Sequence, residues 1–328
     1  MSATTPAPPG GTGALLVVGD VVTDVVARYR APLAAATDTA AEIRTLPGGA
    51  GANAACWAVR AGCADVRLLA RVGADRADWH EESLRRAGVR PLLVRDRHAP
   101  TATVVALVDR GDGERTFLTD SGAALRLTPA DWPPDALEGV GRLHLSGYLL
   151  FAAPADAAAA SVLAAARERG VAVSVDPAST GFLARLGRDR FLAAVDGTDL
   201  LLPNAAEAAL LTGLADPGAA AAALSRRFRL VAVTLGGSGA LVAERGRVVA
   251  EAAAPPARAV DTTGAGDAFT GAFLAALLAG ADPAAAAEAG CRAGADAVTR
   301  VGGRPAGSTG GQAGPDPSAA RGPGAAAG

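Results

Sequence analysis

The segment DTTGAGD at residues 261–267 combines an anion-binding backbone with a carboxylate. A strongly apolar, Ala-rich stretch follows it, so we expect a helix to begin near Gly264. The first N–H groups of a helix have no partner inside the helix, and together with the helix dipole they favour a bound anion such as phosphate. The residues expected to form this anion hole are Gly264, Ala265 and Gly266.

Asp267 stands at the mouth of the predicted anion site. Its charge would repel a phosphate by on the order of 1 to 4 kcal/mol at close range, so anion binding alone does not explain it. A carboxylate here is suited to accept the proton of an attacking hydroxyl while the N–H groups hold a transferred phosphoryl group. The alternative is that Asp267 only stabilises the dipole from the first helical turn.

A second Gly-rich segment, GGAGANAACWAVRAG at residues 48–62, is suited to bind a polyol. Gly48 and Gly49 allow the backbone to approach a ligand closely, and the carboxamide of Asn53 both donates and accepts hydrogen bonds to hydroxyls. Taken alone, the segment is explained equally well as a Gly-rich helix start.

Apolar strands alternate with Ala-rich helices along the chain, which is typical of a mostly parallel sheet covered on both faces. The expected strands are residues 14–18, 66–70, 143–147, 171–177, 200–204 and 230–237. The expected helices are residues 51–62, 79–88, 153–169, 216–228 and 265–280. Polar residues collect at the strand ends, among them Asp20, Asp176, Asn204 and Thr234. Ligands of open α/β sheets bind at this edge, so we expect the site there.

Residues 22–47 and residues 100–120 depart from this alternation. The second segment holds two strand-like runs around a Gly- and Asp-rich turn at residues 110–114. Together the two segments are expected to form a small β-sheet lid, which would exclude water from a phosphoryl-transfer site. The alternative is an ordinary surface hairpin.

Both ends of the chain are poor in residues that pack. Residues 1–13 and 304–328 are nearly all Gly, Pro, Ala, Ser and Thr. Such a composition cannot bury enough apolar surface to offset its ordering entropy, so we expect two disordered tails. The remaining residues 14–303 suit one large domain.

The overall composition excludes several classes of function. The formal charge of −2 and the scattered arginines provide no basic field for nucleic acid. There is no leader pattern and no apolar run of about 20 residues, and three sparse cysteines do not suggest a disulfide framework, so we expect a cytoplasmic protein without membrane contact. Lysine is absent, which excludes P-loop kinases and protein kinases because both need one.

The segment DTTGAGDAFTGAF resembles the carboxyl-terminal signature of the PfkB, or ribokinase-like, family of carbohydrate and nucleoside kinases, and the match is unbroken over residues 261–267. The resemblance implies that Asp267 is the catalytic base and that Gly264, Ala265 and Gly266 form the anion hole. It also implies a ribokinase-like three-layer α/β/α sandwich with a mostly parallel central sheet and a small β-sheet lid.

Two amino-terminal segments, GDVVTD and GGAGAN, resemble the sugar-binding parts of the same family. The residues implied to contact the acceptor are Asp24, Gly48, Gly49 and Asn53. Ribose-specific members often carry a Lys after the glycine pair and an Asn near the opening Asp, where this chain has Ala50 and Val22. The acceptor therefore stays open among ribose, fructose or its phosphate, 2-keto-3-deoxygluconate, adenosine and pseudouridine.

Three further segments resemble the nucleotide and cation sites of the family. The residues implied to contact ATP and Mg²⁺, in PNAAE and TLGGSG, are Asn204, Glu207, Thr234, Gly236 and Gly239. Mg²⁺ prefers few carboxylates and keeps several waters, which suits these residues, although each motif alone reads as a turn and a helix cap. The segment AVTRVGG resembles a K⁺-binding loop, and the K⁺ contacts implied are Asp261, Thr263, Ala297, Arg300 and Gly302.

Together these motifs predict an ATP-dependent kinase that transfers the γ-phosphate to a hydroxyl of a sugar or nucleoside. The alternatives are a non-catalytic sugar- or nucleotide-binding regulatory relative and a nucleotide-dependent oxidoreductase. Retention of Asp267 argues against the first, and Phe269 at the third glycine position of GxGxxG argues against the second. Lid sheets in this family often pair, so the resemblance also implies a homodimer through the lid.

Overall fold

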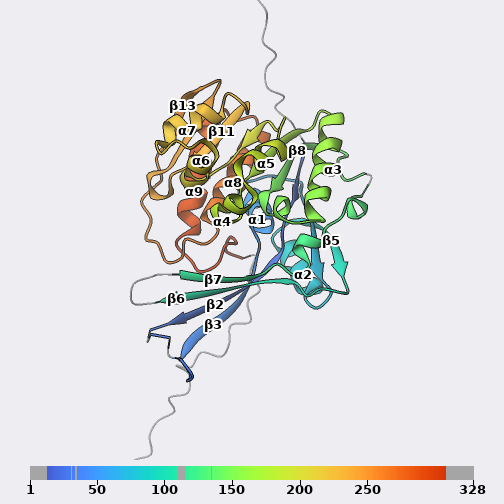
Figure 1. Cartoon of the computed structure of the whole chain (residues 1–328), viewed down its shortest axis with the longest axis vertical. Helices are drawn as coiled ribbons and strands as arrows, with labels where there is room; N and C mark the ends of the chain where they lie inside the picture. Colours follow the sequence, from blue (N-terminus) through green and yellow to red (C-terminus); the bar gives the residue numbers. More distant parts are fainter. Residues whose placement is uncertain (1–12, 31, 34, 110–114, 134, 308–328) are drawn as a thin grey trace, which may run out of the picture.

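The computed structural model describes residues 13–30, 32–33, 35–109, 115–133 and 135–307. Figure 1 shows a large α/β body from which a smaller sheet projects at one end. The predicted turn at residues 110–114, and all but residue 13 and residues 304–307 of the two predicted tails, lie outside the described residues.

Within the described residues, the body contains a nine-stranded sheet in the order β13-β12-β11-β10-β9-β8-β1-β4-β5. Its strands are β1 (Ala14–Val18), β4 (Val66–Gly73), β5 (Arg90–Asp96), β8 (Val140–Ser146), β9 (Ala172–Asp176), β10 (Leu200–Leu201), β11 (Leu230–Thr234), β12 (Ala240–Glu244) and β13 (Arg247–Ala252). All neighbours from β11 to β5 pair in parallel, whereas β12 and β13 form an antiparallel edge. The prediction of a mostly parallel central sheet is confirmed.

Helices cover both faces of this sheet. One core cluster joins the sheet to α3 (Ala155–Glu168), α4 (Thr180–Leu186), α5 (Arg188–Ala194), α6 (Ala205–Thr212) and α7 (Pro217–Leu224). The cluster on the other face joins it to α1 (Ala50–Arg60), α2 (Ala77–Arg86), α8 (Ala265–Leu278) and α9 (Pro283–Ala297). Short 3₁₀ turns lie at Ala124–Arg126, Pro129–Asp131, Gly147–Phe151 and Gly236–Ser238. The result is the three-layer α/β/α sandwich.

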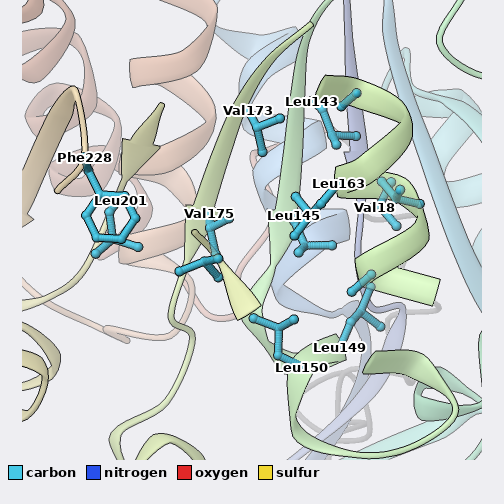
Figure 2. Close-up of a cluster of buried hydrophobic side chains, with 14 of the residues drawn as sticks. Val18, Leu143, Leu145, Leu149, Leu150, Leu163, Val173, Val175, Leu201 and Phe228 are labelled. Carbon is cyan, nitrogen blue, oxygen red and sulfur yellow. The ribbon is translucent and has the colours of Figure 1, made fainter. Parts of the chain in front are cut away.

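The central strand β1 contributes to both core layers because its side chains alternate between the faces of the sheet. Leu16 and Val18 belong to the cluster under α3, and Leu15 and Val17 belong to the cluster under α1 and α8. Figure 2 shows Val18 in the first cluster with strand residues such as Leu145. Burial on both faces explains why this strand is a continuous apolar run rather than an alternating one.

The smaller sheet contains β2 (Val22–Tyr29), β3 (Ala41–Gly48), β6 (Ala102–Asp109) and β7 (Arg115–Asp120), in the order β3-β2-β6-β7. The two segments that interrupt the strand–helix alternation therefore form one sheet, and we call it the lid. Directly paired residues share a face of a sheet. One face carries Leu46, Asp24, Val104 and Thr119, and the opposite face carries Thr45, Val25, Val105 and Leu118.

Several elements differ from the sequence prediction. The Ala-rich helix α7 ends at Leu224 rather than at 228, because a turn begins at Ser225. Neither β5 nor the antiparallel pair β12 and β13 was predicted, and nor were α4, α5 and α9. These elements lie at the sheet edges or outside the core strands, where the apolar pattern is weaker.

The domain also extends past residue 303. Arg304, which the composition assigned to a disordered tail, is only 2% exposed. Its guanidinium donates to the hydroxyl oxygen of Ser83 at 2.8 Å and to the carbonyl oxygen of Gly48 at 3.2 Å. A buried arginine needs such partners, and composition alone does not reveal that they exist.

Candidate active site

A cavity of about 510 Å³ opens at the carboxyl edge of the central sheet, between that edge and the lid. Its walls come from the ends of several strands, from the first turns of α1 and α8, and from the lid face that carries Asp24, Val104 and Thr119. In the sheet order, β1 lies between β8 and β4, so chain connections leave it in opposite directions. Ligands of open α/β sheets bind at such a switch point.

The cavity brings together residues from distant parts of the sequence. The predicted site residues that line it are Asp24, Gly49, Asn53, Asn204, Glu207, Thr234, Thr263, Gly264, Gly266 and Asp267. The predicted site residues that do not line it are Gly48, Ala265, Gly236, Gly239, Asp261, Ala297, Arg300 and Gly302. Three strand-end carboxylates outside the predicted site set, Asp20, Asp120 and Asp176, also line the cavity.

Asp267 lies in the first turn of α8, which begins after Gly264 in a left-handed conformation with φ 76°. The Nδ2 group of Asn53 on α1 donates a 2.8 Å hydrogen bond to Oδ2 of Asp267. The two Gly-rich motifs of the sequence are thus joined through their polar side chains. Helix geometry leaves the first N–H groups of α8 without intrahelical partners at the same point.

Burial raises the pKa of Asp267 to about 8. The hydrogen bond from Asn53 lowers this pKa, and the nearby carboxylates of Asp176, Asp20 and Asp24 raise it further. A base is most effective when its pKa lies near the working pH. The carboxyl of Asp267 can therefore gain or lose a proton close to neutral pH.

A glycine lets the helices that carry these two residues approach closely. A Cβ on Gly271 of α8 would collide with the carbonyl oxygen of Ala54 on α1. Gly271 lies one helical turn after Asp267, and Ala54 directly follows Asn53. The close crossing of α1 and α8 at Gly271 therefore holds the Asn53–Asp267 hydrogen bond at its length.

On the lid side of the cavity, Asp20 connects β1 to α1. Its carboxylate accepts hydrogen bonds from the N–H groups of Ala50 at 2.9 Å and Gly51 at 3.1 Å, and from the hydroxyl of Ser146 at 3.0 Å. In the sequence, Asp20 is one of the polar residues that collect at strand ends. In the structure it caps the first turn of α1 from a neighbouring element, where a negative charge also stabilises the helix dipole.

Asp24 extends from β2 toward the same space. Gly48 leaves room for it, because a Cβ on Gly48 would collide with the Asp24 carboxylate. Burial raises the pKa of Asp24 to about 7, and the positive charge of Arg304 partly offsets this rise. Gly48 thus packs behind Asp24 and does not line the cavity.

On the opposite side, Asn204 and Glu207 form a reciprocal cap at the start of α6. Glu207 donates its N–H to Oδ1 of Asn204 at 2.9 Å, and Asn204 donates its N–H to Oε2 of Glu207 at 2.9 Å. Burial and the neighbouring Asp176 raise the pKa of Glu207 to about 8. These residues therefore both stabilise a helix and line the cavity.

Only part of the segment TLGGSG, residues 234–239, lines the cavity. Thr234 lines the cavity, and Gly236 is exposed beside it at the start of a 3₁₀ turn. Gly239 was predicted to contact ATP, but it is buried and a Cβ there would collide with the carbonyl oxygen of Ala252 on β13. With φ 103°, Gly239 forms the turn into β12 and lies away from the cavity.

Asp261 connects the signature segment to the loop after α9. Its carboxylate accepts hydrogen bonds from the N–H groups of Thr263 at 2.9 Å and Gly302 at 3.0 Å. The carbonyl oxygen of Val298 accepts hydrogen bonds from the N–H groups of Val260 and Asp261. Arg300, in the loop after α9, forms an ion pair with Asp296 at 2.6 Å.

No three His, Cys, Asp or Glu side chains in the described part of the chain are grouped closely enough to hold a metal ion. Mg²⁺ in this cavity would therefore depend on phosphate oxygens and water for most of its ligands. That coordination is usual for Mg²⁺, which loses water reluctantly.

Sequence motifs did not indicate the aromatic wall of the cavity. Tyr148 and Phe182 line it from the body, with ring centroids 5.7 Å apart in an edge-to-face contact, and Phe117 lines it from the lid. The guanidinium of Arg185 stacks on Phe182 at 4.4 Å from the ring centroid. Tyr148 lies in a 3₁₀ turn, Phe182 in the short helix α4 and Phe117 in the edge strand β7, and no sequence motif marks these positions.

The model of the pfkB family carbohydrate kinases matches residues 13–309. The chain belongs to this family. A fructokinase from Klebsiella pneumoniae is 33% identical over 279 residues, which cover 81% of this chain and 85% of the relative. A mouse ribokinase is 32% identical over 270 residues, which cover 79% of this chain and 80% of the relative.

The fold agrees with this assignment. A putative ribokinase II from E. coli, solved in complex with ATP and Mg²⁺, superposes with a TM-score of 0.79 at 24% identity, covering 89% of this chain and 94% of that one. This PfkB protein is thus a carbohydrate kinase with the ribokinase-like fold, a phosphotransferase whose acceptor is an alcohol group. Among the described residues, no helix is sufficiently long and apolar to span a membrane.

Proposed function

We propose that this PfkB protein transfers the γ-phosphate of ATP to a hydroxyl of a sugar or nucleoside, with Asp267 as the general base. The observation that carries the proposal is the placement of Asp267 at the amino end of α8 inside the cavity, hydrogen bonded to Asn53 and with its pKa raised to about 8. In this reaction Asp267 takes the hydroxyl proton, and the hydroxyl oxygen attacks the γ-phosphorus as the bond to ADP breaks.

The start of α8 would bind the transferred phosphoryl group. The first-turn N–H groups of Gly264, Ala265 and Gly266 favour an anion because they lack helical partners and lie at the positive end of the dipole. Gly266 lines the cavity, and a Cβ there would meet no protein atom within 4 Å. Space for phosphate oxygens is thus available beside the base.

ATP and Mg²⁺ would occupy the side of the cavity formed by Asn204, Glu207 and Thr234, with Gly236 at its rim. The presence of ATP and Mg²⁺ in a solved neighbour of the same fold supports this donor. Bound Mg²⁺ would neutralise charge on the β- and γ-phosphates, while Glu207 would orient its water ligands.

The acceptor would lie between the lid and the body, in contact with Asp24, Gly49 and Asn53. Carboxylate and carboxamide groups suit the repeated hydroxyls of a sugar. The fructokinase and ribokinase names of the relatives support a ketohexose or pentose, or a nucleoside that contains one.

Several further properties belong to the same proposal. We propose K⁺ beside Asp261 and Thr263, held mainly by main-chain carbonyls of the loop that includes Ala297, Arg300 and Gly302. A K⁺ ion there would add positive charge near the anion hole. We also propose a cytoplasmic kinase with one domain over residues 14–304 and a homodimer through the lid.

Substitution of the proposed base tests the mechanism. Asp267→Asn should lower kcat by about 10² to 10⁴, measured as phosphorylated sugar formed from ATP. Asp189→Asn is the matched control, because Asp189 also lies in the first turn of a helix, α5, but does not line the cavity. A helix-dipole role alone would leave both variants active. Near-normal turnover by Asp267→Asn would therefore refute the general base.

A further inference from the structure

The charge of the cavity wall bears on which acceptors can enter. Six carboxylates line the cavity, and no Arg, Lys or His does so among the described residues. The carboxylates belong to Asp20, Asp24, Asp120, Asp176, Glu207 and Asp267. They come from strand ends, from the lid and from the first turns of α6 and α8. An acceptor held between the lid and the body would therefore have acidic groups on several sides.

Neutral donors, rather than cations, satisfy the innermost of these carboxylates. Asp20 accepts from two N–H groups and a hydroxyl, and Asp267 accepts from the Asn53 amide. Asp176 accepts from the N–H of Ala178 at 2.7 Å and from the hydroxyl of Thr270 at 3.4 Å. Such donors bring no positive charge into the cavity. At pH 8 the carboxyls of Asp24 and Asp176 are ionised, since burial raises their pKa values only to about 7 and about 6.

Four described arginines lie near the cavity without lining it, and one of them, Arg185, stacks on the ring of Phe182. Arg304 acts electrostatically on Asp24 but is buried, with its guanidinium directed to Ser83 and to the Gly48 carbonyl. Strand pairing places Arg28 and Arg44 on the cavity-side face of the lid, the face of Asp24. Arg44 pairs directly with Val26, and Val26 lies two residues from both Asp24 and Arg28 along β2. Neither arginine lines the cavity, and Arg44 is ion paired with Glu42.

We propose that this kinase selects an uncharged acceptor, a free sugar or a nucleoside, and rejects acceptors that already carry a phosphate or a carboxylate. The proposal rests on the kinase function proposed above. Mg²⁺ would neutralise the phosphates of the donor, but the described residues that line the acceptor side include no Arg, Lys or His. A phosphate or carboxylate there would be repelled by carboxylates at close range and would find no arginine among these lining residues to pair with.

An acceptor panel tests this selectivity directly. The neutral members are fructose, ribose, adenosine and pseudouridine, and the anionic members are fructose 1-phosphate, fructose 6-phosphate and 2-keto-3-deoxygluconate. We expect kcat/KM for the best neutral acceptor to exceed that for every anionic acceptor by at least about 10-fold at pH 8, because each close carboxylate adds repulsion. An anionic acceptor used as well as the best neutral one would overturn the proposal.

A binding readout separates this proposal from the kinase function itself. With ADP and Mg²⁺ present, neutral acceptors should raise the melting temperature of the full-length wild-type protein, and phosphorylated acceptors should not. Binding of a neutral sugar without turnover of any acceptor would contradict the kinase function but support the charge selectivity. Equal melting shifts by fructose and fructose 1-phosphate would overturn the selectivity whatever the turnover.

A charge variant on the lid gives the converse test. Val104 lines the cavity from β6 and directly pairs with Asp24 of β2. Val104→Lys should raise the ratio of kcat/KM for fructose 1-phosphate to that for fructose by about 10-fold, because it supplies the missing cation. Val104→Met is the control of similar length without charge and should leave the ratio unchanged. An equal ratio in folded Val104→Lys and Val104→Met would count against the proposal.

Discussion

Burial, opposed by the hydrogen bond from Asn53, sets the pH at which the proposed base Asp267 is ionised. The pKa of Asp267 is raised to about 8, and only the ionised form accepts a proton. We therefore expect kcat/KM to rise with pH and to level off above about pH 8. Asn53→Leu removes the donor that lowers this pKa, so the rising limb should move to higher pH by about one unit.

The measurement is kcat/KM from pH 5.5 to 9.5 by direct detection of the phosphorylated product. Asn53 also faces the acceptor, so the informative quantity is the position of the limb and not its height. A rising limb of kcat/KM near pH 4 in the wild-type protein would contradict the assignment of Asp267 as the base. A limb at the same pH in the wild-type protein and in Asn53→Leu would contradict it as well.

The same raised pKa predicts a dependence of stability on pH. Between about pH 4 and pH 8 the folded protein keeps a proton on Asp267 that the unfolded chain has released, so the free energy of unfolding falls as pH rises through this range. Asp267→Asn cannot ionise and should be more stable than wild type at pH 8.5, by about 1 kcal/mol after allowance for solvent contact.

Thermal unfolding at pH 5.5 and pH 8.5 checks this expectation. The difference in melting temperature between Asp267→Asn and wild type should grow with pH to a few degrees, as about 1 kcal/mol implies for a domain of this size. A difference in melting temperature that stays constant, or that shrinks as pH rises, would show that burial does not raise the pKa of Asp267.

Individual site residues were predictable where a motif and a chemical reason agreed. Asp267, Gly264 and Asn53 meet these conditions, because their residue types explain anion binding and proton transfer at short sequence spacing. The role of Arg304 was not predictable, because its partners Ser83 and Gly48 lie more than 200 residues earlier in the chain. Contacts of this length depend on the fold and leave no local pattern.

The crossing of α1 and α8 predicts a further effect. Gly271→Val should force the helices apart, because even a Cβ at this position would collide with α1. Overpacking of this kind costs about 1 to 3 kcal/mol, and it should lower kcat by lengthening the hydrogen bond one turn away. The measurements are the free energy of unfolding and kcat.

Gly181→Ala is the matched control for this variant. Gly181 lies in α4, where a Cβ would meet only the Ser179 hydroxyl at 3.9 Å. This substitution should stabilise the protein by about 0.5 to 1 kcal/mol, as expected for Gly to Ala within a helix. An equally mild effect of Gly271→Val would show that the helices do not need the close crossing.

The elements themselves were predictable in proportion to their burial. Core strands such as β1 and β8 are apolar runs and were found. β1 has the predicted bounds, whereas β8 begins three residues earlier and ends one residue earlier than predicted. The antiparallel edge strand β13 alternates between exposed and half-buried residues and was missed. Gly239 does not line the cavity, and a Gly-rich turn between two strands resembles a ligand-binding loop when its neighbours are unknown.

The outer face of the lid predicts how whole molecules associate. Ile43 and Leu118 on this face are 64% and 57% exposed, and strand pairing places Val25 and Val105 beside Leu118 on the same face. Pairing of two lids would bury these apolar side chains. We therefore expect light scattering to give about twice the 32.2 kDa mass of one chain, and Leu118→Asp to halve it.

Leu214→Asp is the control for the dimer, because Leu214 is also 41% exposed but follows α6 on the body. It should leave the mass unchanged. A wild-type protein that stays monomeric at high concentration would rule out pairing through the lid.

The acceptor cavity is divided between two separate sheets. Asp24 and Val104 belong to the lid, whereas Asp20 and Asp267 belong to the body. A sugar bound between them would contact both sheets. Its measured dissociation constant would then combine the free energy of these contacts with the free energy needed to bring the two sheets together. Substitutions far from the sugar that favour a conformation with the two sheets apart would therefore weaken binding, in proportion to the fraction of molecules in that conformation. Two variants could then differ in affinity for the same sugar while making the same contacts with it.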